Sequence, residues 1–198
     1  MVEGGTESRN IMGTAVERAK PRILLTGPPG VGKTTLVQKV CDLLRGTGIP
    51  TKGFFTQEIR NGRTRIGFDV VTLDGRRGAL ARLKASAGAE SKCTVGQYAV
   101  TPKSFESFAL PVFPTQQNFG GILVLDEIGR MELFSDRFRQ EVKKAFSSPS
   151  ISILATIPAK PLSFTESLRH SPNTTVFMVN QRNRDDLVVQ VFDMLTKT

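Results

Sequence analysis

The feature that most constrains this chain is a glycine-rich loop at residues 27–34, which reads GPPGVGKT and fits the Walker A pattern G-x-x-x-x-G-K-T. Gly27, Gly30 and Gly32 permit backbone angles and close approaches that a Cβ atom would block. The inward-facing N–H groups of such a loop, and the positive end of the helix that follows, surround a β-phosphate. An apolar run precedes the loop and a helical pattern follows it, which is the order this motif requires. The stretch therefore predicts a nucleotide-binding site.

Two side chains of the loop have chemical roles of their own. Lys33 carries a point charge that can reach the β- and γ-phosphates, and the Thr34 hydroxyl is placed to ligate Mg²⁺. We therefore expect Mg²⁺ as the cofactor. The predicted nucleotide-binding residues of the loop are Gly27, Pro28, Pro29, Gly30, Val31, Gly32, Lys33, Thr34 and Thr35.

The length and composition indicate how the chain is organised. A chain of 198 residues is long enough for one full core and rather short for two domains. We expect residues 1–20 to form a flexible extension and residues 21–198 to form a single domain. No apolar run is long enough to span a bilayer, and the N-terminus lacks the apolar stretch of a signal peptide. These features predict a cytoplasmic or nuclear protein without a membrane partner, and no apolar stripe calls for more than a monomer.

The net charge of +9 has two interpretations, a basic nucleic-acid surface or a solvated surface that also attracts nucleotides. Basic residues are densest at residues 60–84, where the acidic residues are Asp69 and Asp74. Only Phe68 interleaves them, and no helix-turn-helix, RNP or zinc-finger pattern is present. We therefore do not expect nucleic acid as a partner.

The pattern along the chain predicts an α/β fold. Buried strands are expected near residues 22–26, 121–126 and 151–157, and a last strand near 175–179. Helices are expected near residues 36–44, 101–109, 135–146, 163–169 and 187–195. Strands at residues 53–59 and 65–73, joined by an Asn61-Gly62 turn, form an inserted antiparallel hairpin. Residues 84–95 are expected to be an exposed loop and residues 95–100 a short strand. Strands that alternate with helices after a phosphate loop predict a mainly parallel sheet with helices on both faces.

A second motif lies at the end of the predicted strand at residues 121–126. Asp126 follows the apolar run at residues 122–125, as in a Walker B motif, and would bind Mg²⁺. Adjacent strand residues point to opposite sides, so Glu127 is free to polarise a water for attack on the γ-phosphate. The pair could also be a helix start or a solvated turn, but the Walker A loop favours function. The predicted nucleotide-binding residues here are Ile122, Leu123, Val124, Leu125, Asp126, Glu127, Ile128 and Gly129.

Four further residues are candidates for the site. Thr156 would meet the γ-phosphate or the attacking water if its strand lies between the two motif strands; a plain β-strand threonine is the alternative. Arg130 is a candidate for offsetting transition-state charge. Asn183 and Arg184 follow the last strand, where they would touch the base or ribose or else act as an ordinary helix cap.

Five segments together resemble a known family. They are GPPGVGKTT at residues 27–35, GFFTQEIR at 53–60, RIGFDVVTL at 65–73, VGQY at 95–98 and LDEIGRMEL at 125–133. They are similar to the family of the cancer-related nucleoside-triphosphatases, which is also found in thermophilic bacteria and archaea. The resemblance covers the chain from about residue 22 to its C-terminus and leaves the first 20 residues outside.

The resemblance implies Mg²⁺-dependent hydrolysis of nucleoside triphosphates to diphosphate and phosphate, with broad tolerance of the base. It also implies a P-loop NTPase fold with strand order 5-1-4-3-2 and a catalytic glutamate beside Walker B. One position departs from the vertebrate pattern Asp-Glu-Ile-Gly-Lys, because Arg130 stands in the fifth place. The charge is kept but the geometry is not.

Three functions remain open at this point. A nucleoside-triphosphatase is favoured, because Glu127 suits activation of a water. A P-loop small-molecule kinase is the alternative enzyme, although only Lys160 and Arg169 could supply a basic lid between the last two strands. An NTP-dependent switch that binds RNA or a protein is the non-enzymatic alternative. Broad base tolerance is expected independently, because residues 180–183 do not fit the guanine-reading pattern Asn-Lys-x-Asp.

Overall fold

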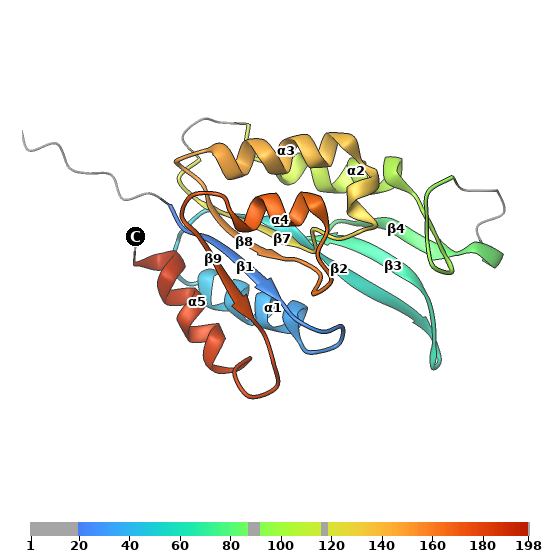
Figure 1. Ribbon diagram of the computed structural model, residues 1–198, viewed down its shortest axis with the longest axis horizontal. Helices are drawn as coiled ribbons and strands as arrows, with labels where there is room; N and C mark the ends of the chain where they lie inside the picture. The colour runs from blue at the N-terminus through green and yellow to red at the C-terminus, as the bar shows by residue number, and fades with distance from the viewer. Residues whose placement is uncertain (1–19, 87–91, 116–118, 198) are drawn as a thin grey trace, which may run out of the picture.

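The computed structural model describes residues 20–86, 92–115 and 119–197, and within them nine strands form one sheet (Figure 1). The order across the sheet is β5-β6-β4-β3-β2-β7-β8-β1-β9. The predicted extension at residues 1–20 lies, apart from Lys20, outside the described residues. The strands are β1 Arg22–Thr26, β2 Thr51–Asn61, β3 Thr64–Thr72, β4 Arg77–Leu83, β5 Thr94–Val95, β6 Tyr98–Val100, β7 Ile122–Asp126, β8 Ser152–Thr156 and β9 Thr174–Met178.

Five strands, β2, β7, β8, β1 and β9, run parallel as neighbours. Numbered along the chain, these five lie in the order 5-1-4-3-2, which confirms the predicted arrangement. β8 lies between β7 and β1, and its Thr156 is the register partner of Leu25 on β1. The carboxyl ends of β1, β7 and β8 therefore meet at one edge of the sheet, where parallel α/β folds bind their ligands.

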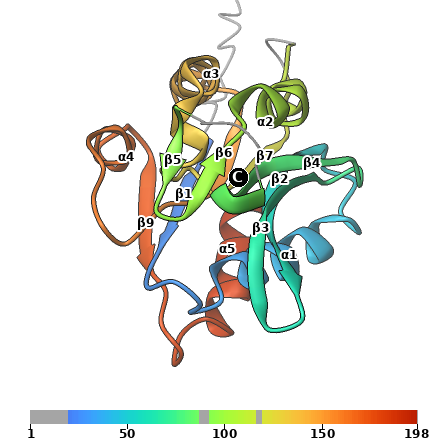
Figure 2. The same cartoon turned by 90° about the vertical axis from the view of Figure 1, so that its right-hand side faces the viewer.

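Helices cover both faces of the parallel strands (Figures 1 and 2). β1 shows why, because Ile23 and Leu25 pack toward one hydrophobic cluster and Leu24 toward the other, and all three are fully buried. The first cluster includes residues of α1 Lys33–Leu44 and α5 Asp186–Thr196. The second includes residues of α2 Pro102–Ala109, α3 Asp136–Ser147 and α4 Ser163–Arg169. Three short 3-10 helices complete the described elements: η1 Lys84–Ser86, η2 Leu110–Val112 and η3 Glu132–Phe134.

The antiparallel part of the sheet is larger than the predicted hairpin. β2 and β3 do pair through the Asn61-Gly62 turn, but β4, β6 and β5 extend the sheet further in antiparallel fashion. The expected single strand at residues 95–100 is wrong, since Gly96 has a φ of 56° and the chain turns there between β5 and β6.

β4 is a strand that sequence patterns did not predict. Its sequence, RGALARL, has few β-branched or aromatic residues, so intrinsic preference does not favour a strand. It forms between β3 and β6, and Gly78 admits the ring of Phe108 from α2, which lies 2.1 Å from where a Cβ atom would sit. Tertiary packing thus determines this element.

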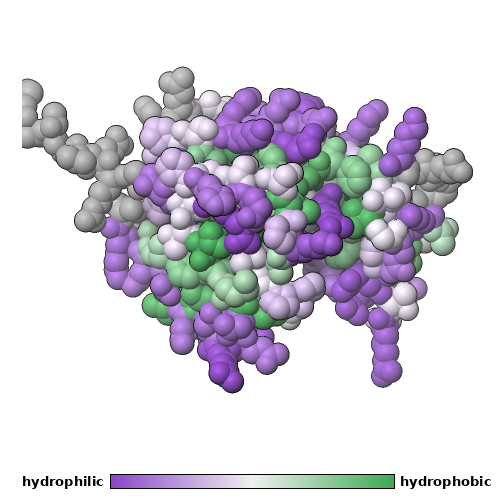
Figure 3. Space-filling model, in the orientation of Figure 1, coloured by the Kyte–Doolittle hydropathy of each residue, from purple (hydrophilic) through white to green (hydrophobic). Residues whose placement is uncertain are grey.

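The surface is mainly hydrophilic over α3 and at the tip of the β2–β3 hairpin (Figure 3). Among the described residues, no helix has both the length and the apolar character needed to cross a membrane.

Candidate nucleotide site

The phosphate loop connects β1 to α1 at the carboxyl edge of the sheet. Gly27, Gly30 and Gly32 have φ angles of 152°, 75° and 107°, which is the backbone region that glycine alone enters freely. At Gly27 the space is also closed, because a Cβ atom would lie 2.5 Å from the carbonyl oxygen of Val179. α1 begins directly after Gly32, so its unpaired N–H groups face the loop. The local geometry is therefore that of an anion-binding turn.

Lys33 is held against this loop. Its side chain is largely buried, and Nζ donates hydrogen bonds to the carbonyl oxygens of Gly27, at 2.9 Å, and Pro28, at 3.4 Å. The ammonium charge also acts on the carboxyl groups of Asp126 and Glu127, lowering the pKa of each against the larger opposing effect of burial. One cation thus lies within electrostatic reach of both members of the acidic pair.

Asp126 is the last residue of β7 and is 1% exposed. The hydroxyl of Thr156 donates to its Oδ1, and Thr34 lies close enough to lower the pKa of the carboxyl by hydrogen bonding. Burial is nevertheless the dominant influence and raises the pKa of Asp126. Its Oδ2 is buried and accepts no hydrogen bond within the described part of the chain.

These groups fit Mg²⁺. The orphaned Oδ2 of Asp126 and the hydroxyl of Thr34 are oxygen ligands, which this cation prefers. The described residues contain no group of three or more His, Cys, Asp or Glu side chains that could hold a metal ion.

Thr156 ends β8 and is fully buried between the two motif strands, as the predicted strand order required. Its hydroxyl is bonded to Asp126. This geometry favours a role for Thr156 in orienting Asp126. The expected contact of Thr156 with the γ-phosphate or the attacking water stays a prediction.

Glu127 follows the strand and is half-buried. Burial raises the pKa of its carboxyl, Lys33 lowers it, and the charge of Asp126 raises it. Its Oε1 lies 2.6 Å from where a Cβ atom of Gly129 would sit, so it approaches the backbone of the following turn. The surroundings of the two carboxyl groups therefore differ, since Asp126 accepts from Thr156 and Glu127 approaches Gly129.

Glu132 is a site neighbour that sequence reasoning missed. It lies in η3, is 4% exposed, and its Oε2 accepts the N–H of Gly129 at 3.1 Å. Burial, followed by the charge of Glu127, raises the pKa of its carboxyl to about 8. The signal available in the sequence was a carboxylate between Met131 and Leu133, five residues after the proposed base.

This raised pKa predicts a pH dependence of stability. The unfolded glutamate titrates near pH ~4.3, so above that pH the folded state keeps a proton that the unfolded chain loses. The associated stability is complete at low pH and is lost as the pH rises toward about 8. Glu132→Gln removes the titration but keeps an oxygen for the Gly129 N–H. Urea denaturation without nucleotide should therefore show the variant gaining on the wild type from about pH 5 to about pH 8. A pH-independent difference would contradict the assignment.

Arg130 is exposed and forms no hydrogen bond or ion pair within residues 20–86, 92–115 and 119–197. It follows Gly129, so its backbone lies next to the acidic pair while its side chain has no partner among the described residues. The expected role of Arg130 in offsetting transition-state charge stays a prediction.

Asn183 and Arg184 lie next to each other in the loop between β9 and α5, but their side chains bond to different parts of the protein. The Asn183 side chain serves its own loop, donating to the carbonyl of Met178 at 2.9 Å and accepting from the N–H of Asn180 at 2.8 Å. Arg184 instead reaches the phosphate loop, where Nη1 donates to the carbonyl of Val31 at 3.3 Å. A cavity of about 170 Å³ opens there, lined by Gly32, Thr35, Leu36, Lys39, Arg184 and Asp185.

Five of the six arginines in the β2–β3–β4 region have acidic partners. Arg60 and Arg65 pair with Glu58, Arg76 with Asp74, and Arg77 and Arg82 with Asp69. Glu58 precedes the basic stretch at residues 60–84, so the comparison of basic and acidic residues within that stretch did not include it. The prediction that nucleic acid is not a partner stays a prediction, and these three carboxylates offset part of the local positive charge.

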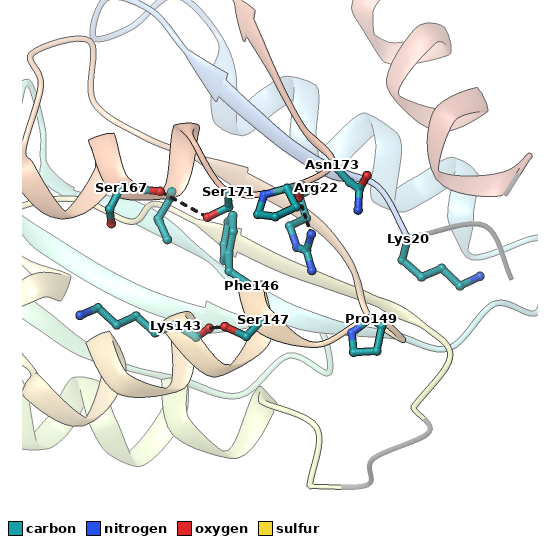
Figure 4. Close-up of a pocket in the computed structure, with 11 residues that line it drawn as sticks. Lys20, Arg22, Lys143, Phe146, Ser147, Pro149, Ser167, Ser171 and Asn173 are labelled. Atoms are coloured by element: carbon teal, nitrogen blue, oxygen red, sulfur yellow. Dashed lines mark hydrogen bonds between the residues drawn. The ribbon is translucent and has the colours of Figure 1, made fainter.

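A larger cavity, of about 540 Å³, lies at the opposite end of the sheet beside the start of β1 (Figure 4). Arg22 lines it and donates to the carbonyl oxygens of Ser148, at 3.0 Å, and Pro172. Those carbonyls follow the C-terminal ends of α3 and α4, where the helix dipoles favour a cation. Arg22 thus joins the ends of these two helices through Nη1 and Nη2, while its buried Nε has no partner among the described residues. This cavity is a structural junction rather than the nucleotide site.

Replacing Arg22 by methionine should lower the free energy of unfolding by ~1–3 kcal/mol, because the Ser148 and Pro172 carbonyls lose their donor. The matched control is Lys20→Met, since Lys20 lines the same cavity but makes no hydrogen bond with the described residues. The control should change stability by no more than ~0.5 kcal/mol. Urea denaturation measures both, and equal effects would show that lost charge rather than lost hydrogen bonding matters.

The five-strand parallel order, the Walker A loop after β1 and the buried acid at the end of β7 define the fold of a P-loop NTPase. The chain belongs to the NTPase family, whose sequence model matches residues 22–192. It is 47% identical over 178 residues to the cancer-related nucleoside-triphosphatase of Homo sapiens, covering 85% of this chain and 93% of that protein. It is 38% identical to the nucleoside-triphosphatase THEP1 of Thermotoga maritima, covering 88% and 95%. The crystal structure of THEP1 from Aquifex aeolicus superposes with a TM-score of 0.77 at 32% identity, covering 88% and 99%.

Proposed function

We propose that this chain hydrolyses nucleoside triphosphates to diphosphates and phosphate, in a Mg²⁺-dependent reaction with broad tolerance of the base. The observation that carries the proposal is the phosphate loop at the carboxyl edge of the sheet, where Lys33 is bonded to the loop and the buried Asp126 ends the second motif strand β7. Membership of a family of nucleoside-triphosphatases supports the reaction class.

Binding of the triphosphate rests on the loop. Backbone N–H groups around Gly27, Gly30 and Gly32 and at the start of α1 would hold the β-phosphate. Lys33 would exchange its bonds to the Gly27 and Pro28 carbonyls for the β- and γ-phosphate oxygens. Thr34 and the free Oδ2 of Asp126 would hold Mg²⁺, which neutralises phosphate charge when bound. Thr156 would keep Asp126 oriented for that task.

Glu127 would act as the general base for hydrolysis. A water placed beside its carboxylate gives a proton to Glu127 while its oxygen forms a bond to the γ-phosphorus. The bond from that phosphorus to the β,γ-bridging oxygen breaks, and the diphosphate leaves with the electron pair. Burial raises the pKa of Glu127, which makes it a better proton acceptor once ionised. Arg130 would need to turn toward the phosphates to offset charge, which its exposed and unpaired side chain permits.

The side chains around the cavity beside the phosphate loop support broad tolerance of the base. The cavity beside Gly32 is bordered by the Arg184 guanidinium, which can stack on any base, and by the Lys39–Asp185 ion pair at 2.8 Å. Asn183 was expected to touch the base or ribose, but its side-chain amide is hydrogen-bonded to the backbone of Met178 and Asn180. Recognition would therefore rest on the phosphates. A cytoplasmic or nuclear location and a monomeric state remain predictions.

The kinase alternative receives little support from α4. Of the two basic residues that a lid between the last two strands could use, Arg169 pairs with Glu166 at 2.8 Å and donates to the Thr26 hydroxyl at 3.3 Å. It is thus tied to the body of the protein. Lys160 is exposed.

The test is phosphate release from ATP, GTP, CTP and UTP without an added acceptor, with Mg²⁺ and with a chelator. We expect release from all four with Mg²⁺, at kcat/KM values within ~10-fold of one another, and loss of release with the chelator. Release only after a small acceptor is added would support the kinase. Salt-sensitive retention on RNA that depends on nucleotide, without turnover, would support the switch.

A further inference from the structure

Glu132 is a buried carboxyl group that none of the proposed steps uses. It is 4% exposed and forms no ion pair within the described residues. Its hydrogen-bonding environment consists of backbone N–H groups, that of Gly129 at 3.1 Å and its own. Burying a carboxyl without a cation costs free energy, so its place beside the acidic pair calls for an explanation.

Gly129 is the point where Glu132 and Glu127 meet. A Cβ atom at this residue would lie 2.6 Å from Oε1 of Glu127 and 2.9 Å from Oε2 of Glu132. Any other residue would push at least one of these carboxyl groups away. The two side chains therefore share the space beside one α-carbon, which only glycine leaves open.

The turn that carries Glu127 is fixed on both sides of this point. The N–H of Ile128 donates to the carbonyl of Thr156 at 2.9 Å, which ties the turn to β8. The N–H of Leu133 donates to the carbonyl of Gly129 at 3.1 Å, which ties it to η3. The hydrogen bond from the Gly129 N–H to Glu132 differs from these two, because its acceptor is a side chain rather than a backbone carbonyl. Removing that side chain would loosen the turn where the Glu127 carboxylate rests.

We propose that Glu132 is a positioning residue for hydrolysis: it fixes Gly129 through the backbone N–H and so holds the Glu127 carboxylate where it can accept a proton from the attacking water. The inference rests on the proposed function, in which Glu127 is the base. A base that drifts by even an ångström loses much of its effect on rate. Burial supports this role, because the raised pKa of Glu132 keeps it mostly neutral at pH 7 and limits repulsion of Glu127.

The experiment compares the full chain as wild type, Glu132→Ala, Glu132→Gln, Glu127→Gln and the double variant Glu127→Gln/Glu132→Ala. Phosphate release from ATP with Mg²⁺ gives kcat and KM. Glu132→Ala should lower kcat ~10-fold or more while KM changes less than ~3-fold. Glu132→Gln, which keeps an acceptor for the Gly129 N–H, should recover most of that loss. A loss expressed in KM alone, or no recovery by glutamine, would overturn the positioning role.

The double variant separates positioning from general disruption. A residue that acts only through Glu127 adds nothing once the base is gone, so the double variant should be no slower than Glu127→Gln alone. Multiplicative losses would overturn the positioning role and leave the proposed function intact. An unimpaired Glu127→Gln would overturn both the base assignment and the inference.

Gly129→Ala keeps the inference testable if Glu132→Ala does not fold. The added methyl meets the tips of two flexible side chains, so these can shift with little cost to folding. We expect the thermal midpoint to stay close to that of the wild type and kcat to fall ~10-fold or more, with nucleotide affinity kept. Wild-type kcat in a folded Gly129→Ala protein would overturn the inference.

Discussion

Glu127→Gln is expected to slow phosphate release by ~100-fold or more while leaving nucleotide affinity close to that of the wild type. The substitution keeps the size of the side chain and a hydrogen-bonding oxygen but removes the proton acceptor. Affinity should persist because the phosphate loop and Lys33 are unchanged, and within the described residues Glu127 forms no hydrogen bond or ion pair with either. Steady-state phosphate release and equilibrium titration with a fluorescent nucleotide analogue measure the two quantities.

The control for Glu127→Gln is Glu141→Gln, which makes the same change of charge on α3, where Glu141 pairs with Lys144 at the surface. It should release phosphate at the wild-type rate, since exposed ion pairs contribute little. Equal turnover in the wild type and Glu127→Gln would remove the base from this account.

The second large effect is expected from Lys33→Ala, which should lower kcat/KM by ~100-fold or more and weaken nucleotide binding as well. Lys33 is the cation whose charge acts on both Asp126 and Glu127, and it is held at the loop by the Gly27 and Pro28 carbonyls. Its loss removes the charge that would follow the γ-phosphate into the transition state. Both ground-state affinity and turnover should therefore fall, unlike in Glu127→Gln.

Lys144→Ala is the matched control for Lys33→Ala, because Lys144 is an exposed lysine on α3 far from the loop in the chain. We expect no more than a ~2-fold change in kcat/KM for it. If Lys33→Ala lost turnover but bound nucleotide as tightly as the wild type, the ammonium group would act only in the transition state and the binding part of this account would be wrong.

Much of the parallel half of the fold could be predicted because β1, β7 and β8 are mainly apolar runs between clear turn or cap signals. The run at residues 122–125 is one example, since it ends at Asp126 and is buried throughout. Ser135 is an example of a cap signal. It was expected to start a helix, and its hydroxyl accepts the N–H of Phe138 at 3.0 Å. These are local signals, and tertiary packing agrees with them.

The antiparallel half could not be predicted to the same extent, because its strands depend on partners distant in sequence. β4 becomes a strand through pairing with β3 and β6 and through the ring of Phe108 against Gly78. The turn at Gly96 splits a stretch that local pattern treats as one strand. Strand propensity is weak prior information where packing decides.

The candidate site also has features that the sequence predicts and features that it does not. Spacing alone located the loop, Asp126 and Glu127, because motif and chain order fix them. The sequence could not predict which hydrogen-bond partner each polar side chain has. Thr156 donates a hydrogen bond to Asp126, and Asn183 donates one within its own loop. Glu132 was missed because its burial beside Gly129 depends on how η3 folds back after β7.

The most direct test of the central claim is hydrolysis of ATP in water enriched in heavy oxygen, with Mg²⁺ and no other acceptor, followed by mass analysis of both products. If a water activated at Glu127 attacks the γ-phosphorus, one heavy oxygen enters the released phosphate and none enters the diphosphate. Heavy oxygen in the diphosphate would mean attack at the β-phosphorus. Either that result or the absence of any released phosphate would contradict the mechanism proposed for this chain.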